Sequence, residues 1–254
     1  MSKRNSSKGD QDLLTSKMSN SQQPDFFSLS DEDVKEIDSF VKLIHITDNV
    51  LVINYGGYFQ KQLSDLFTRI SETILNSKKA QAVPELIKQI TTRINSFISY
   101  KNKEHDKKAL QKRFIEDSKK IRSLKNELDS HLLRLSDYSE TLCSFKSQLQ
   151  DLYSTITKYI IAGEKKLDQV SVILQEEDFA KNRSIHSIEE YNYIVQCYKN
   201  FSTRLDSLRV SQTSALQYIM QIDAELAKNS TLIQTISGII NNTVPAFEQM
   251  YHLS

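Results

Sequence analysis

The sequence predicts an all-α fold: an elongated, antiparallel, coiled-coil-like hairpin of two long helices, with shorter N-terminal helices packed on it. Only five glycines and three prolines occur in 254 residues, and neither type lies between Glu85 and Ala162 or between Glu164 and Ser237. Because Gly and Pro commonly end helices, stretches of this length without them indicate very long helices. Both stretches also carry apolar residues in alternating steps of four and three, which places those residues on one helical face.

The N-terminal region divides into a tail and a first helix. Residues 1–29 are rich in Ser, Lys, Asn and Gln and lack hydrophobic periodicity, which predicts a disordered tail. Residues 30–254 are expected to form a single elongated helical domain. Ser30 followed by Asp33 is typical of an N-cap with an acidic first turn, so the first helix is predicted over residues 31–45.

Two further short helices follow. The second is predicted over residues 48–76, with Tyr55, Gly56 and Gly57 in its first turns. Adjacent glycines in a helix cost about 1 kcal/mol each relative to Ala, so they indicate a kink or a close approach by a neighbouring helix. The third helix is predicted over residues 84–100, with a proline in its first turn, where the missing N–H costs nothing.

The two long helices are predicted over residues 103–176 and 187–243, the second ended by Pro245. The segment Glu176–His186 loses the apolar pattern and is expected to reverse the chain, which makes the two helices antiparallel. The residues expected to be buried against each other are Leu124, Leu128, Leu142, Leu149 and Ile156 on the first helix and Leu205, Leu208, Ile219, Ile222 and Ile233 on the second.

Composition and charge exclude several classes of protein. The net charge is +1, which gives no general preference for nucleic acid. No apolar run reaches the roughly 18 residues that a membrane-spanning helix needs, and the basic N-terminus is not followed by the apolar segment of a secretory signal. A cytoplasmic protein is therefore expected, in which Cys143 and Cys197 are reduced thiols.

Signatures of catalysis and metal binding are absent from the sequence. The histidines are isolated, and none forms the paired spacing that places two metal ligands on one helical face. No phosphate-binding glycine motif and no nucleophile signature occur either. The sequence therefore predicts no catalytic residue, no cofactor and no metal. Polar residues within the apolar stripes, Gln212 and Asn229, are interpreted as fixing the register between helices.

One stretch has a strong charge asymmetry. Residues 101–125 contain ten Lys or Arg against four acidic residues. The simpler interpretation is a solvated helix face, because no aromatic cluster accompanies the charges. The alternative is docking on an anionic membrane surface or on an acidic partner.

Three segments together resemble one family. They are ITDNVLVINYGGYFQKQLSDLFTRISETIL (46–75), YIIAGEKKL (159–167), and a C-terminal set of Arg204-Leu205, Gln217, Gln221-Ile222, Asn229 and Asn242-Thr243-Val244-Pro245. In order and spacing they resemble the TelA-type toxic anion (tellurite) resistance proteins of bacteria. Gln212, Asp223 and Phe247 stand where that family typically has arginines and a tryptophan. The resemblance implies a cytoplasmic, helical, non-enzymatic protein linked to tolerance of tellurite and envelope-level stress.

The resemblance also selects candidate interaction or packing residues: Tyr55, Gly56, Arg204, Gln221, Asn229 and Pro245. The leading hypothesis is a binding or scaffolding protein whose partners are other proteins of the resistance system, with self-association as a further option. The first alternative is a peripheral membrane protein that docks through residues 101–125 at the inner membrane face. The second is an oxyanion-binding or reducing activity with Cys143 and Cys197 as the reactive groups.

Overall fold

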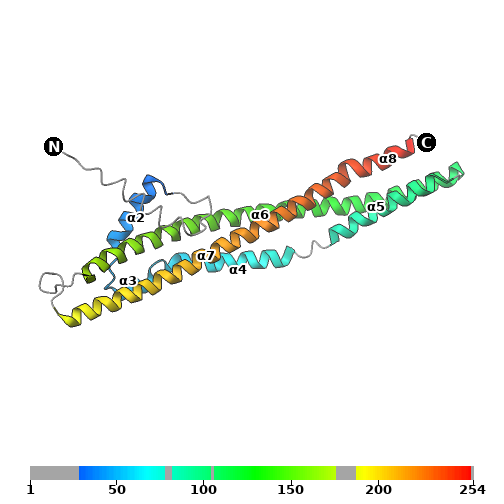
Figure 1. Cartoon of the computed structure of the whole chain (residues 1–254). Helices are drawn as coiled ribbons and strands as arrows, with labels where there is room; N and C mark the ends of the chain where they lie inside the picture. Colours follow the sequence, from blue (N-terminus) through cyan, green and yellow to red (C-terminus); the bar gives the residue numbers. More distant parts are fainter. Residues whose placement is uncertain (1–28, 78–81, 104–105, 176–186, 253–254) are drawn as a thin grey trace, which may run out of the picture. The chain divides into compact units, whose positions relative to one another are not determined.

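All regular secondary structure in the part of the chain that the structure describes is helical. The computed structural model describes residues 29–77, 82–103, 106–175 and 187–252. Its elements, in order, are α2 (Asp31–Leu43), α3 (Asn49–Asn54), α4 (Gly57–Ser77), α5 (Ala82–Lys101), α6 (Lys107–Gln175), α7 (Ile188–Gly238), the π-helix η2 (Ile239–Thr243) and α8 (Val244–His252) (Figure 1). No strand occurs in these described ranges, and the predicted all-α class is confirmed.

Two parts of the sequence-based prediction lie outside the described residues: nearly all of the tail 1–29 and the reversing segment 176–186. The chain forms two compact units. Unit 1 combines the chain up to Phe59 with Leu152–Gln212, and unit 2 combines Gln60–Asp151 with the chain from Thr213 onward. Both units contain a part of α6 and a part of α7, so the single domain over residues 30–254 stays a prediction.

The two long helices are antiparallel within unit 1. Gln212 Nε2 of α7 donates to Thr157 Oγ1 of α6 at 2.6 Å, and the Arg209 guanidinium pairs with Glu164 at 2.7 Å. Residue numbers therefore rise along α6 as they fall along α7. The predicted antiparallel order is confirmed.

Unit 2 shows the same antiparallel order. Lys146 of α6 pairs with Asp223 of α7 at 2.6 Å, and Asn229 Nδ2 lies 3.4 Å from Ser139 Oγ. These interhelical hydrogen bonds of Asn229 and Gln212 agree with the interpretation that both residues fix register.

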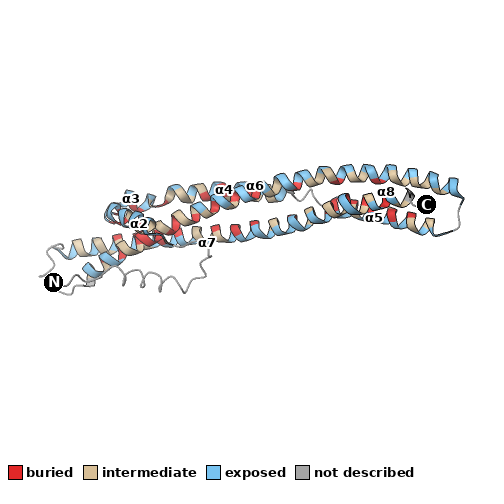
Figure 2. Cartoon of the chain, turned by 90° about the horizontal axis from the view of Figure 1, so that it is seen from above, coloured by how far each residue is buried: buried red, intermediate tan, exposed pale blue. Residues whose placement is uncertain are grey.

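Within each unit the helices meet along their apolar faces, where the buried residues lie (Figure 2). The core of unit 2 joins α5 to α6, α7 and the C-terminal helices. Its buried residues are Val83, Leu86, Ile90, Ile94, Phe97, Ile121, Leu128, Leu135, Ile236, Ile240, Val244 and Phe247. Of the residues expected to be buried, Leu124 and Ile233 are only partly buried, and the others are buried.

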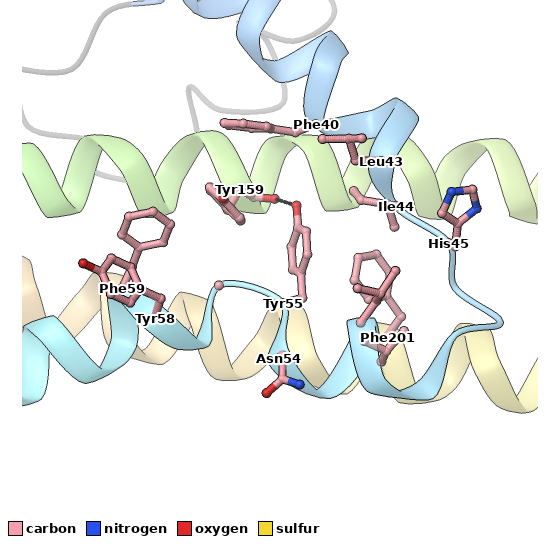
Figure 3. Close-up of a pocket in the computed structure, with 13 residues that line it drawn as sticks. Phe40, Leu43, Ile44, His45, Asn54, Tyr55, Tyr58, Phe59, Tyr159 and Phe201 are labelled. Carbon is pink, nitrogen blue, oxygen red and sulfur yellow. Dashed lines mark hydrogen bonds between the residues drawn. The ribbon is translucent and has the colours of Figure 1, made fainter.

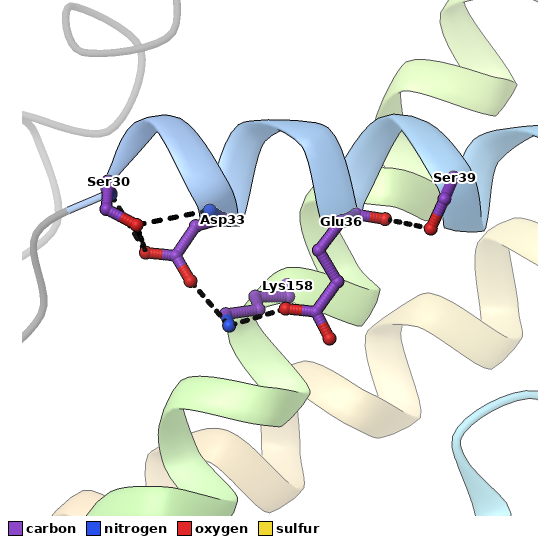
Figure 4. Close-up of polar contacts among 5 residues, drawn as sticks. All are labelled: Ser30, Asp33, Glu36, Ser39 and Lys158. Atoms are coloured by element: carbon purple, nitrogen blue, oxygen red, sulfur yellow. Dashed lines mark hydrogen bonds and ion pairs between the residues drawn. The ribbon is translucent and has the colours of Figure 1, made fainter.

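A capping box and an ion-pair cluster fix α2 in unit 1 (Figure 4). Ser30 Oγ accepts from the Asp33 N–H at 3.1 Å, and the Ser30 N–H donates to the Asp33 carboxylate at 2.8 Å. Lys158 of α6 pairs with Asp33 at 2.5 Å and with Glu36 at 2.7 Å. The hydrogen bonds from Lys158 and from Ser30 lower the pKa of Asp33 to about 2. The predicted N-cap at Ser30 is therefore confirmed.

Two predicted helix boundaries are wrong, each for a local reason. The helix predicted over 48–76 is two helices, α3 and α4, because Gly56, whose φ is +67°, interrupts the helical backbone. Pro245 does not end the last helix, because the chain widens into η2 and continues as α8. In this wide turn the Val244 N–H bonds to Ile239 O rather than to the carbonyl four residues back, and proline lies in the first turn of the next helix.

A candidate binding site at the Tyr55 turn

The break between α3 and α4 is held by specific local contacts. Asp48 caps α3, its carboxylate accepting from the N–H groups of Val50 at 2.9 Å and Leu51 at 3.1 Å. A Cβ atom at Gly56 would lie only 2.8 Å from a methyl group of Leu208 on α7. Positive φ and close packing both require glycine here. The close helix approach expected at this glycine is thus observed, as a packed turn rather than within a helix.

Tyr55 links this turn to the long helices of unit 1. Its hydroxyl donates to the backbone carbonyl of Tyr159 on α6 at 2.7 Å. Its ring lies 5.2 Å from the Tyr159 ring and 5.1 Å from the Phe201 ring on α7, measured between centroids. Burial, and next the neighbouring Tyr159, raise the pKa of Tyr55 above its ordinary value. The phenol therefore stays protonated and acts as a hydrogen-bond donor.

Arg204 of α7 closes the turn from the other side. Its Nε donates to the backbone carbonyl of Tyr55 at 2.8 Å, at the C-terminal end of α3, where cations are favourable. The side chain is half-buried, and burial lowers the pKa of its guanidinium. The structure thus brings together Tyr55, Gly56 and Arg204, which sequence comparison alone had grouped.

One side of the turn opens into a pocket of about 270 Å³ (Figure 3). Its walls come from α2, α3, the start of α4, α6 and α7, and they are mainly aromatic: Phe40, Tyr55, Phe59, Tyr159 and Phe201. His45 and Asn54 supply the polar lining. Large apolar side chains remain exposed at the rim: Leu43 is 70% exposed, Tyr58 69% and Leu51 48%. We call this the aromatic pocket.

A second concavity, of about 480 Å³, lies between α3 and α7 and is lined by Arg204. Its other lining residues are Asn49, Val52, Ile53, Asn200, Thr203 and Ser207. We call this the Arg204 concavity. It differs from the aromatic pocket in having a cationic side chain and no aromatic residue in its lining.

The remaining predicted residues lie in unit 2 and do not gather at one place. Gln221 is exposed on α7, whereas Asn229 is buried and lies close to Ser139. Pro245 is in the first turn of α8. Asn229 therefore agrees with a role in packing and register, whereas Gln221 faces solvent.

Other candidate chemistry can be placed within the described residues. No group of three or more His, Cys, Asp or Glu side chains there is arranged to hold a metal ion. Cys143 is exposed in unit 2 and Cys197 is buried in unit 1. None of the described helices has a stretch long and apolar enough to cross a membrane.

The sequence analysis missed the aromatic walls of the pocket. Phe40 and Phe201 come from helices far apart in the chain, and each is an ordinary apolar position in its own helix. The available signal was the density of aromatic residues around the double glycine, where Tyr55, Tyr58 and Phe59 follow one another closely.

Comparison with known proteins gives a consistent result. The model of the family described as toxic anion resistance protein (TelA) matches residues 37–254. A TelA-like protein of Staphylococcus aureus strain bovine RF122 is 21% identical over 238 residues, covering 87% of this chain and 62% of the relative. The TelA-like protein of strain Mu50 is 21% identical over 240 residues with the same coverage. The chain therefore spans about 62% of the length of these curated relatives. No solved structure matches the chain significantly.

Proposed function

Because the chain belongs to the TelA family of toxic anion resistance proteins, we propose that it is a non-enzymatic binding protein of a bacterial toxic-anion (tellurite) resistance system. Its expected place is the cytoplasm, and its expected partners are other proteins of that system. The binding surface in this proposal is the aromatic pocket with its rim.

The exposed rim is the observation that supports this proposal. Leu43, Leu51 and Tyr58 leave large apolar surface in water beside an open pocket with aromatic walls. Contiguous exposed apolar surface is typical of interaction sites, and aromatic residues dominate the energy of many interfaces. A partner segment that carries an apolar or aromatic side chain fits this surface, because that side chain would enter the pocket while the rim covers its flanks.

Site-specific photo-crosslinking tests this proposal. A photoreactive phenylalanine analogue replaces Tyr58 at the rim in one variant of the full chain and Val210 in a matched control. Val210 is 67% exposed on α7 and does not line the pocket. In the native host exposed to tellurite, a discrete adduct is expected from position 58 and none from position 210. Equal adducts from both positions, or no adduct at position 58, would contradict the proposal.

A second candidate function, peripheral membrane association, is favoured by the surface of α6. Lys108, Lys112 and Lys119 are exposed at spacings that share one helical face, and Ile115 on the same face is 58% exposed. None of these three lysines pairs with another described residue. Basic residues around an exposed apolar side chain suit an anionic lipid surface. Other basic residues of the stretch form ion pairs: Arg113–Asp117, Arg122–Glu248 and Lys125–Asp129.

Sedimentation with lipid vesicles separates the two functions. Vesicles containing phosphatidylglycerol are expected to carry the chain down at low salt and to release it at high salt. Replacing Lys108, Lys112 and Lys119 with Gln should abolish the sedimentation. Vesicle binding that does not depend on salt, or that is unchanged by the triple substitution, would exclude peripheral membrane association.

A further inference from the structure

We infer that the Arg204 concavity binds a small, doubly charged inorganic oxyanion, with the guanidinium of Arg204 as its cationic anchor. This site shares Val52 with the lining of the aromatic pocket and takes a different class of ligand. The inference does not depend on the proposed protein partner.

Arg204 has no counterion among the residues that the structure describes. The structure gives this side chain one hydrogen bond, from Nε to the carbonyl of Tyr55, and its terminal nitrogens bond to no other described residue. Arg209 on the same helix shows the ordinary arrangement, because its guanidinium pairs with both Glu164 and Asp206. A half-buried cation without a partner is costly, so its terminal N–H groups are available to a ligand.

Amide side chains line the same concavity as Arg204. They belong to Asn49 on α3 and Asn200 on α7. The Asn200 carbonyl oxygen already accepts from Gln196 Nε2 at 2.9 Å, which leaves its amide N–H groups as donors. The Thr203 hydroxyl is held by the carbonyl of Lys199 at 3.1 Å and so can accept but not donate there. Amide donors from two helices therefore accompany the positive charge.

The charges near the lining of the Arg204 concavity also favour an anion. No carboxylate is among the lining residues. The two acidic residues next to the lining in sequence are both engaged: Asp48 accepts from the N–H groups that it caps on α3, and Asp206 pairs with Arg209. Val52 and Ile53 form the apolar part of the wall, and the contact of an ion pair with apolar surface strengthens its attraction relative to water.

These features select the ligand class. The planar fork of a guanidinium matches two oxygens of one anion, and such charge-assisted bonds are stronger than neutral ones. Sulfate, phosphate and tellurite share this arrangement of charged oxygens. A doubly charged ion exploits the unpaired cation and the amide donors more fully than a single carboxylate does.

Calorimetric titration of the full chain tests the inference. Sodium sulfate, phosphate and tellurite are the probes, at constant ionic strength set with chloride. The titrations use a Cys143→Ser background, because tellurite could oxidise this exposed thiol. Saturable binding is expected for these ions, and acetate should bind more weakly by about tenfold or more. Absence of saturable binding for all three oxyanions, or acetate binding as tight as sulfate binding, would overturn the inference.

Three variants locate the site. Arg204→Gln should weaken sulfate binding by about tenfold or more, whereas Arg209→Gln, the matched arginine control, should leave it unchanged. Because Arg204→Gln also loses the bond to Tyr55, a second variant keeps that bond. Asn200→Leu removes an amide and places an apolar side chain in the concavity, and it should weaken binding several-fold. If Arg204→Gln or Asn200→Leu titrates like the parent chain, the ion binds elsewhere and the inference fails.

Discussion

The chain interrupts its helices in two very different ways. In unit 1, between α3 and α4, Gly56 leaves the helical region with a φ of +67°, and Leu208 packs against it. In unit 2, between α7 and α8, Gly238 keeps helical angles and the backbone only widens into a π-helix. Apart from its chain neighbours and the adjacent backbone of its own helix, no described heavy atom lies within 4 Å of where its Cβ would be. The same residue type is therefore structurally required at one interruption and is replaceable at the other.

The surroundings of the two interruptions differ in the same sense. The turn at Gly56 borders the aromatic pocket and the Arg204 concavity. Beyond η2, by contrast, the core is sealed: Phe247 is fully buried, with its ring 5.3 Å from both the Phe97 and Phe114 rings. Open apolar surface at one break and a closed core at the other agree with the proposal that the aromatic pocket in unit 1 is a binding surface.

The largest effect is expected from Gly56→Ala. A left-handed φ costs a non-glycine residue about 1–2 kcal/mol, and over-packing against Leu208 adds about 1–3 kcal/mol. Urea denaturation should therefore show a loss of about 2–5 kcal/mol in the free energy of unfolding. An unchanged or increased stability would mean that this turn is neither strained nor tightly packed.

Gly163→Ala separates packing from backbone strain. Gly163 lies within α6 in unit 1, where an added Cβ would approach a methyl group of the buried Leu205 to less than normal contact distance. Over-packing of about 1–3 kcal/mol is partly offset by about 1 kcal/mol of helix propensity. A net loss of up to about 2 kcal/mol is expected by the same denaturation assay. A loss as large as that of Gly56→Ala would show that positive φ contributes little at Gly56.

Gly238→Ala should have the opposite sign. With open space at its Cβ position and helical backbone angles, alanine should raise the free energy of unfolding by about 0.5–1 kcal/mol through helix propensity. Thermal denaturation followed by circular dichroism measures this gain. If alanine destabilises the chain here, the π-helix depends on glycine and the contrast between the two interruptions is lost.

The smallest expected effect is the pH-dependent contribution of the Asp33–Lys158 ion pair to stability. The pKa of Asp33 is lowered from 3.8 to about 2 by the side-chain bond from Lys158 and the bonds from Ser30. Its contribution to stability is therefore complete above the unfolded value near 3.8 and is lost as pH falls through about 2. Because both side chains of the ion pair are partly exposed, the contribution should stay below about 1 kcal/mol.

Urea denaturation of the wild-type chain and of Asp33→Asn, between neutral pH and pH 2, measures this contribution of Asp33 to the free energy of unfolding. The wild-type chain should be slightly more stable at neutral pH, and the difference should vanish toward the acidic end. A difference that grows as pH falls would reverse the sign of the linkage and exclude the Lys158 contact as its cause.

The sequence predicted the regular parts of this molecule better than the irregular ones. The stripe residues Leu128, Leu142 and Leu205 repeat over many turns, so their periodicity identifies a buried face without knowledge of any partner helix. The break at Gly56 depends on Leu208, about 150 residues away in the chain, and no local pattern reveals that contact.

The candidate site was predictable only in part for the same reason. The family resemblance selected Tyr55, Gly56 and Arg204, but it also selected Gln221 and Asn229, which lie elsewhere. Spacing along the sequence cannot distinguish these cases, because the residues of the turn meet only through the antiparallel packing of α6 and α7 in unit 1. The aromatic walls and the unpaired charge of Arg204 became visible only with that packing.

Tellurite tolerance tests most directly the claim that the functional surface is the rim of the aromatic pocket in unit 1. A strain lacking this gene is complemented with the wild-type chain, with Leu43→Ser/Tyr58→Ser at the rim, or with the exposed control Val210→Ser, at protein levels matched by immunoblotting. Circular dichroism of each purified protein verifies that the fold is kept, as the exposure of all three side chains leads us to expect. The Val210→Ser control is expected to restore tellurite tolerance, and the rim variant is not. Equal tolerance with both variants would contradict it.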